Sequence, residues 1–271
     1  MKENRKIRTD SISKKGTLMN ESILYTYAML FLNTYKKLMF SAGSSYYHNA
    51  IIIGIVELQQ QGIIEIEWKS AAMPEDEQDR LHVHAWHEKE ETKSMELPFL
   101  KRAKALSNDL QEYKFLYDRI PETQPINLIY LIKEDYRSEI NKKVTNMQEI
   151  IERGLLERNM AFQTEKKRLF GKARTILLPV PTALQNTATY IRTILNQEQP
   201  VAEQDFILCY LVKIERMLPS LYDKQEAIKL YDKIESISQT KPYNDGIYLK
   251  LTNLVRSLEE SVFQTFTLSN E

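Results

Sequence analysis

Apolar residues recur at the spacing of an α-helix along most of this chain, and this spacing constrains the fold more than any other feature of the sequence. The first run follows Asn20, a residue type that often caps the N-terminus of a helix. Its apolar positions lie on one helical face: Ile23, Leu24, Tyr27, Leu30 and Phe31. Only 7 glycines and 9 prolines occur in 271 residues, which is too few for the turns of an all-β sandwich. The sequence therefore predicts a mainly α protein.

Interruptions of the helical spacing divide the first part of the chain into segments. Helices are predicted over about 21–36, 44–61, 124–133 and 139–153. The stretch IIEIEW after Gly62 predicts a short strand, and helical structure is expected to resume near Pro98. The charged stretch 74–94 predicts an exposed excursion with room for one strand, LHVHAW.

The last third of the chain predicts three more amphipathic helices between Thr182 and Phe266. Their expected breaks are Pro200, Pro219 and the loop KPYNDG. No linker rich in Gly, Ser or Pro divides the chain. Residues 20–271 are therefore predicted to form one domain, preceded by a basic, flexible N-terminal arm, residues 1–19.

Two segments share one order of residue types, a helix followed by a glycine, two apolar residues and a strand. These segments are IVELQQQGIIEIE and IIERGLLERNMAF. The comparison predicts Gly154 as the C-cap of the second helix. The shared order is either an internal repeat or a recurrent way to leave a helix.

Charge and cysteine content exclude several classes of protein. Lys plus Arg equals Asp plus Glu, at 37 each, so binding to nucleic acid or acidic lipid requires a local patch. Residues 1–16 carry six basic and two acidic residues, a net 6 − 2 = +4, but no apolar stretch follows as in a secretory signal. The longest apolar stretches, YAMLFL and AIIIGIV, fall short of the ~18 residues of a spanning helix. The single cysteine, Cys209, is expected to be a buried thiol in a reducing compartment, the cytoplasm.

The segment 160–179 is predicted to be a hairpin with a basic tip and an apolar apex. Leu169 and Phe170 lie beside the turn at Gly171, and leaving such side chains in water forfeits roughly 1.5 to 3 kcal/mol each. Either the tip folds back on its own domain, or a lipid surface covers it, with basic residues worth about 1 kcal/mol each near anionic headgroups. The candidate lipid-binding residues are Lys166, Lys167, Arg168, Leu169, Phe170, Lys172 and Arg174.

Other functions have weaker support in the sequence. A winged helix would also follow a helix with a strand, a basic turn and a strand, but NKKVTNMQEIIERG offers few side chains suited to reading bases. A strand HVHAWH would place His82 and His84 on one face, as in some metal sites, with His87 nearby, yet a solvated polar strand is favoured. The chain contains no HExxH, GxSxG, Walker A or GxGxxG motif, so no catalytic residue, cofactor or metal is predicted.

The order of these elements resembles the Golgi phosphoprotein 3 family over most of residues 20–266. The resemblance is carried by ESILYTYAMLFLN, AIIIGIVELQQQGIIEIE, MQEIIERGLLERNMAFQTEKKRLFGKARTILLPVPTAL and DFILCYLVKIERMLPSLY. It implies a single compact helical domain, a central bundle wrapped by amphipathic helices, with a protruding β-hairpin that inserts into membranes. In eukaryotic members it also implies recognition of phosphatidylinositol 4-phosphate and of the cytosolic tails of Golgi glycosyltransferases, which is an adaptor role.

The headgroup pocket of those members uses a Trp, an Arg on the same helix and two basic residues one turn apart. The corresponding positions here fall near Ala42, Ile51, Ile140 and Lys143. Only Lys143 matches, with Lys142 beside it, so the resemblance implies these two lysines as the headgroup-binding residues. This mixture fits a bacterial-type member that lacks the Golgi role.

The sequence thus predicts a non-enzymatic, cytoplasmic protein, peripheral on the membrane surface, that binds anionic membrane lipids through the hairpin. A homo-oligomer would present several hairpins and strengthen the attachment. A winged-helix nucleic-acid-binding protein and a protein-interaction scaffold without lipid binding are the alternatives.

Overall fold

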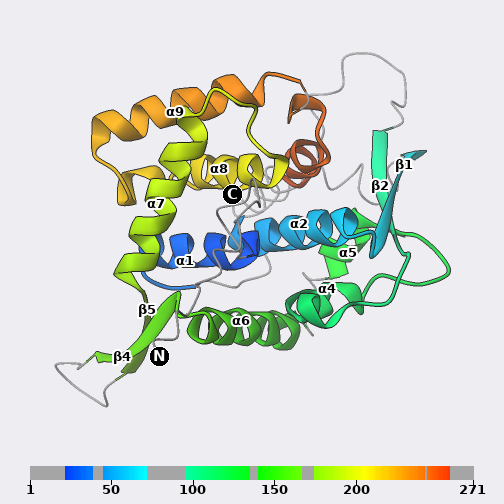
Figure 1. Ribbon diagram of the computed structural model, residues 1–271. Helices are drawn as coiled ribbons and strands as arrows, with labels where there is room; N and C mark the ends of the chain where they lie inside the picture. The colour runs from blue at the N-terminus through cyan, green and yellow to red at the C-terminus, as the bar shows by residue number, and fades with distance from the viewer. Residues whose placement is uncertain are drawn as a thin grey trace, which may run out of the picture.

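A pair of buried helices forms the centre of the computed structural model, which describes residues 22–38, 45–71, 95–134, 140–166, 174–241 and 243–256. α1 (Ile23–Tyr35) is buried at every residue from 23 to 32, and α2 (Ser45–Gln60) is buried from 46 to 56. A helix that is apolar around its whole circumference belongs in the interior. Figure 1 shows these two helices crossing the middle of the body.

Four outer helices cover the central pair, and three of them are amphipathic. α6 (Ile140–Glu157) buries Met147, Ile151 and Leu155, which are four residues apart and so share one face. α7 (Pro181–Asn196) buries Tyr190, Ile191 and Ile194 among others.

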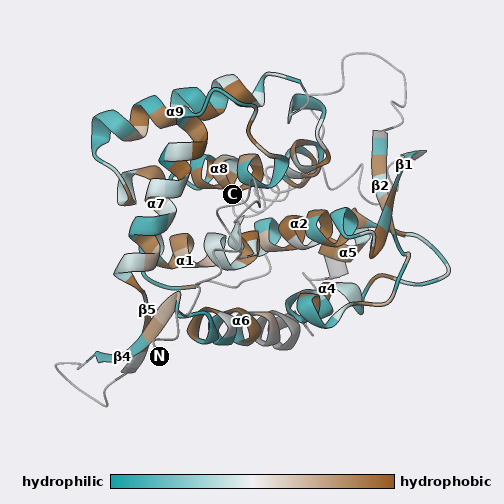
Figure 2. Cartoon of the chain, viewed as in Figure 1, coloured by the Kyte–Doolittle hydropathy of each residue, from teal (hydrophilic) through white to brown (hydrophobic). Residues whose placement is uncertain are grey.

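α8 (Glu203–Ile214) and α9 (Lys224–Ser238) lie on the other side of α1 from α6 (Figure 1). α9 buries only Ala227, Leu230 and Ile234, and hydrophilic and hydrophobic residues alternate along it in Figure 2. α8 lies beneath α9 and is buried at six positions. One core cluster joins residues from Ile23 to Val255, so the outer helices pack around a shared interior.

Two small antiparallel sheets lie at opposite ends of the helical body (Figure 1). β1 (Ile64–Ala71), β2 (Met95–Arg102) and β3 (Ile126–Asn127) form a three-stranded sheet in the order β1-β2-β3. β4 (Ala161–Lys166) and β5 (Arg174–Pro179) form a two-stranded hairpin. The short helices are η1 (Asn108–Tyr113), α4 (Lys114–Tyr117), α5 (Leu128–Glu134), η2 (Leu218–Ser220) and η3 (Tyr243–Asp245), and residues 247–256 are also helical.

The helix exits that lead into β1 and β4 have the same geometry. After α2, Gly62 has φ 64°, its N–H donates to Gln59 O at 2.9 Å, and the Ile63 N–H donates to Leu58 O at 2.9 Å. This is the Schellman arrangement, in which a left-handed residue reverses the chain and satisfies the last carbonyl groups. After α6 the same bonds form around Asn159, with φ 54°, from Asn159 N to Leu156 O and from Met160 N to Leu155 O. The recurrence predicted from the sequence therefore exists, but it aligns Gly62 with Asn159 rather than with Gly154.

The predicted mainly α fold and compact helical domain are confirmed, and so are the two central helices to within two residues at each end. The N-cap of α1 was predicted at Asn20, which lies outside the described residues, and is instead Ser22, whose hydroxyl accepts the Leu24 N–H at 3.2 Å. A serine directly before the first helical residue is an equally good cap.

One helical prediction between residues 98 and 133 is wrong, and another is confirmed with a later start. Pro98 lies inside β2, opposite Trp68, and β3 pairs with β2 only at Phe99 and Leu100. A proline without an N–H is tolerated there because the strand has a partner on one side only. Helix α5 begins at Leu128 rather than near 124, because the Asn127 side chain accepts the Ile129 N–H at 2.9 Å and caps it.

The predicted breaks near Pro200, Pro219 and the loop KPYNDG all separate helices. They leave four helical segments rather than three, because residues 247–256 are helical in addition to α7, α8 and α9. Among the described helices, none combines the length and the apolar character that crossing a membrane requires.

Candidate functional site

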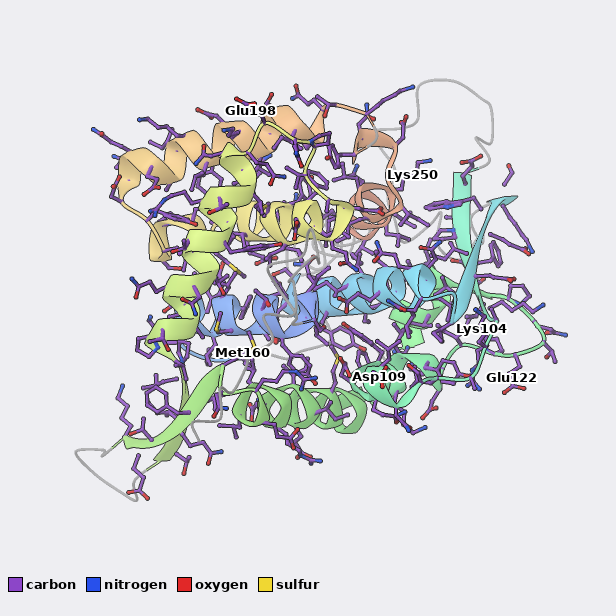
Figure 3. The ribbon with its side chains drawn as sticks, in the orientation of Figure 1. Lys104, Asp109, Glu122, Met160, Glu198 and Lys250 are labelled. Carbon is purple, nitrogen blue, oxygen red and sulfur yellow. The ribbon has the colours of Figure 1, made fainter. Side chains whose placement is uncertain are left out.

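The β4–β5 hairpin lies at the outer edge of the body, beside the ends of α6 and α7 (Figure 1). Six consecutive pairs define its register, from Ala161 opposite Pro179 to Lys166 opposite Arg174. The Val180 N–H donates to Met160 O at 2.9 Å and closes the root of the hairpin, where Figure 3 labels Met160. The hairpin therefore extends outward from a root that is tied to two helices.

A glycine inside α6 brings this root close to α1. Gly154 was predicted as the C-cap, and this is wrong, because α6 continues through it to Glu157. A Cβ at Gly154 would overlap the ring of Tyr25 on α1, so only glycine allows this approach. One turn later the Arg158 guanidinium lies 4.1 Å from the centre of the same ring, a cation–π contact. Two successive turns at the end of α6 thus contact the same tyrosine of α1, just before the hairpin begins.

One face of the hairpin belongs to the core. In an antiparallel pair, residues directly opposite each other have side chains on the same face. Ala161 is only 4% exposed, and on the same face Leu177, opposite Gln163, packs against the main core cluster. β5 also lies against α1. This inward face therefore packs the hairpin onto the helical body.

The opposite face carries apolar side chains that the core does not use. Phe162 is 42% exposed and pairs with Leu178, and the next pair on this face is Thr164 with Ile176. Phe162, Leu178 and Ile176 belong to none of the core clusters formed by the described residues, although Leu178 and Ile176 are only partly exposed. β5 is coloured as hydrophobic along most of its length in Figure 2. We call these three residues the outward apolar face.

Of the predicted lipid-binding residues, two fall within the described hairpin. Lys166 is exposed at the end of β4, and the register places Arg174 opposite it at the start of β5. Lys167, Arg168, Leu169, Phe170 and Lys172 lie outside the described residues. The register of the described strands therefore places the first and last predicted cations at opposite positions, at the end of the hairpin away from its root.

Of the positions that the resemblance aligns with the headgroup pocket, the structure describes the side chain of Ile51 alone. Lys142 and Lys143 lie in the first turn of α6, and their side chains are outside the described part. Ile51 is fully buried in α2, so this position offers no group to a headgroup. Ala42 lies outside the described residues and Ile140 is the first residue of α6.

A second group of titratable side chains lies at the start of α1. The Glu57 carboxylate accepts the Ile23 N–H at 3.1 Å and the Ser22 hydroxyl at 3.1 Å, and the Ser22 hydroxyl also lies 2.8 Å from the hydroxyl of Tyr113. Burial raises the pKa of Glu57 to about 7, because the loss of solvent outweighs these two hydrogen bonds. The neighbouring Glu112, 7% exposed, also has a raised pKa, mainly from burial and partly offset by Arg158. This group caps a central helix with a carboxyl group that titrates near neutrality.

The other candidates from the sequence are the single cysteine and the histidines of HVHAWH. Cys209 is a free, fully buried thiol, as predicted, and burial raises its pKa, which disfavours a reactive thiolate. The residues His82, His84 and His87 lie outside the described residues. Among the residues that the structure describes, no three His, Cys, Asp or Glu side chains lie close enough to hold a metal ion.

Sequence reasoning missed two features of this site. The sequences AFQTEK and RTILLP contain the residues of the outward apolar face. Which of these residues point outward follows only from the strand register and from the inward packing of Leu177. The buried position of Glu57 had no local signal, because VELQQQ has the composition of an exposed helix end.

A scan of the chain against known protein-family models finds no match, and a search of curated proteins finds none either. The resemblance to the Golgi phosphoprotein 3 family therefore stays a prediction from the sequence. Function has to be argued from the residues of the site itself.

Proposed function

We propose that this chain is a non-enzymatic, cytoplasmic peripheral membrane protein that binds anionic lipid through its β4–β5 hairpin. The observation that supports this most is the β4–β5 hairpin at the edge of the helical body, together with the basic residues and the Leu169–Phe170 pair that the sequence places between its two strands. The chain as a whole has no net charge, so the hairpin is a local feature rather than part of a wider basic surface.

Charge and apolar contact would contribute together to such binding. Residues 160–179 contain five basic residues and one acidic residue, a net 5 − 1 = +4. At about 1 kcal/mol for each basic residue near an anionic surface, this is worth about 4 kcal/mol at most. Leu169 and Phe170 would add roughly 1.5 to 3 kcal/mol each on entering the interface. Part of this total offsets the loss of rotational and translational freedom, so reversible attachment is expected.

Nucleic acid is the less favoured ligand, and the exposed surface of α6 is the reason. In a winged helix, the helix before the hairpin would contact DNA. The exposed positions on the described part of α6 are Glu149, Arg153 and Glu157, a net charge of 1 − 2 = −1, and its other face packs inward through Ile151 and Leu155. This part of α6 therefore offers no net positive charge to the phosphates of DNA.

An adaptor role, in which the attached body recruits another protein, follows from the family resemblance, and phosphoinositide-like headgroups are a candidate ligand of Lys142 and Lys143. The scaffold alternative would place a partner protein on the apex instead of lipid.

Co-flotation with vesicles tests the proposal. The full chain should float with vesicles of phosphatidylcholine and phosphatidylserine, and the double variant Leu169→Asp with Phe170→Asp should stay at the bottom of the gradient. A variant that floats as well as the parent would show that the apex is not the contact. A gel-shift assay with duplex DNA on the same sample should give no shift, whereas a salt-sensitive shift would favour the winged-helix alternative.

A further inference from the structure

We infer that β4 and β5 contact the bilayer with the outward apolar face, so that the two strands lie along the lipid surface. This rests on the proposed function and specifies the surface that meets the lipid. The surface consists of Phe162, Ile176 and Leu178, with Lys166 and the position of Arg174 at its far end.

The first support is the division of the hairpin into two faces. The inward face is used by the core through Ala161 and Leu177. The outward face carries three large apolar side chains that belong to none of the described core clusters, and the largest of them, Phe162, is 42% exposed. A short two-stranded hairpin that is apolar on both faces needs a second apolar environment.

The second support is the charge at the end of this face. The register places Lys166 directly opposite Arg174, and like charges at such positions destabilise a strand pair unless an anion compensates them. The only acidic residue of the strands, Glu165, belongs to the other face, because it is one residue from Lys166. The outward face therefore runs from apolar to basic, which matches the passage from acyl chains to anionic headgroups.

The distance between Phe162 and the far end of β4 distinguishes a hairpin that stands upright on the bilayer from one that lies along it. Phe162 lies four residues before Lys166, which is about 13 Å along an extended strand. An apex that enters an interface only ~5–10 Å deep, with the hairpin standing upright, would leave Phe162 in water. Contact at Phe162 therefore requires the strands to lie along the surface.

A matched pair of variants tests the face. Phe162 and Gln163 are neighbours on β4, both are exposed, and they belong to opposite faces. Phe162→Asp and Gln163→Asp add the same charge to the same strand. The ratio of their vesicle affinities therefore reports the contribution of the outward apolar face, without the general effect of the added charge. We expect Phe162→Asp to bind phosphatidylcholine–phosphatidylserine vesicles about tenfold more weakly than Gln163→Asp, from the apolar area that Phe162 still exposes.

A label at each position gives a second readout that does not depend on affinity. Cys209 is fully buried, so Phe162→Cys and Gln163→Cys each provide one accessible thiol for an environment-sensitive fluorophore. The fluorophore at position 162 should shift to the blue when the same vesicles are added, and the one at position 163 should shift much less. Far-UV circular dichroism and thermal melting of all variants should match the parent, because both side chains are exposed.

The outcomes distinguish this inference from the proposed function. If the parent floats and the apex double variant does not, but Phe162→Asp binds like Gln163→Asp, the hairpin stands upright and the inference fails while the proposed function stands. If the parent ignores the vesicles altogether, both fail. Equal blue shifts at positions 162 and 163 would also overturn the orientation.

Discussion

The carboxyl group of Glu57 gives the most quantitative prediction, because its burial links stability to pH. In the folded protein it accepts the Ile23 N–H and the Ser22 hydroxyl, and burial raises its pKa to about 7. The test is Glu57→Gln, which has nearly the same shape and holds the position permanently neutral. Its amide oxygen can still accept the Ile23 N–H, and the Ser22 hydroxyl can rotate to accept from the amide nitrogen.

The magnitude follows from the change in pKa between the two states. The ordinary pKa of 4.5 represents the unfolded chain, and the folded value is about 7. The folded protein thus binds this proton more tightly, so its contribution to stability is present below the unfolded pKa and is lost as pH rises through the folded pKa. The difference of the two pKa values corresponds to about 3 kcal/mol. Glu57→Gln should therefore be more stable than the parent by about 1 kcal/mol near pH 5, where part of this contribution is already lost, and by about 3 kcal/mol near pH 8.

Urea unfolding followed by far-UV circular dichroism, from about pH 5 to about pH 8, measures this difference directly. Subtracting the parent from the variant at each pH removes most of the contribution of other groups, including Glu112. Glu149→Gln, an exposed substitution on α6, is the matched control and should show no comparable change with pH. A difference between Glu57→Gln and the parent that stays constant with pH, or that shrinks as pH rises, would show that folding does not raise the pKa of Glu57.

Three further predictions concern the root of the hairpin and the core. Gly154→Ala should destabilise the protein by about 2 kcal/mol in urea unfolding, because the added Cβ overlaps Tyr25, even though alanine favours a helix. A stabilised variant would contradict the close approach of α6 to α1. Asn159→Val should lower stability by roughly 1–2 kcal/mol whereas Asn159→Gly should not, because this position has φ 54°. Equal effects of the two variants in thermal melts would argue against a left-handed C-cap at Asn159. Cys209 should react with a thiol reagent only in urea, since it is fully buried; rapid labelling of the native protein would contradict its position.

The parts of the fold that could be predicted from sequence are those with local causes. α1 and α2 are apolar on all sides and α2 ends at a glycine, so their extents followed from composition and capping. The strand after Gly62 followed from its alternation. The hairpin could be predicted because a basic turn separates two short apolar runs.

The errors arose where a distant contact decides the role of a residue. Gly154 has the local features of a helix end, but its purpose is to admit the ring of Tyr25, which is remote in sequence. The real helix end, Asn159, is a weaker local signal than glycine. Pro98 similarly lies in a strand because β3 is too short to require its missing N–H.

In the candidate site, too, the features with a local pattern could be predicted and those that depend on distant contacts could not. Its cations and apex are visible in the sequence, since an apolar pair within a run of basic residues is a local pattern. The outward apolar face is not, because it depends on which strand face packs against α1. Only this packing shows which face of the hairpin is free to contact another surface.

The most direct test of the account measures how the full chain partitions between buffer and vesicles as phosphatidylserine content and salt are varied. Lipid binding through the hairpin predicts that the bound fraction rises with phosphatidylserine, falls as salt screens the hairpin cations, and is low on phosphatidylcholine alone. A chain that stays in solution at low salt, even on the most acidic vesicles, would contradict it.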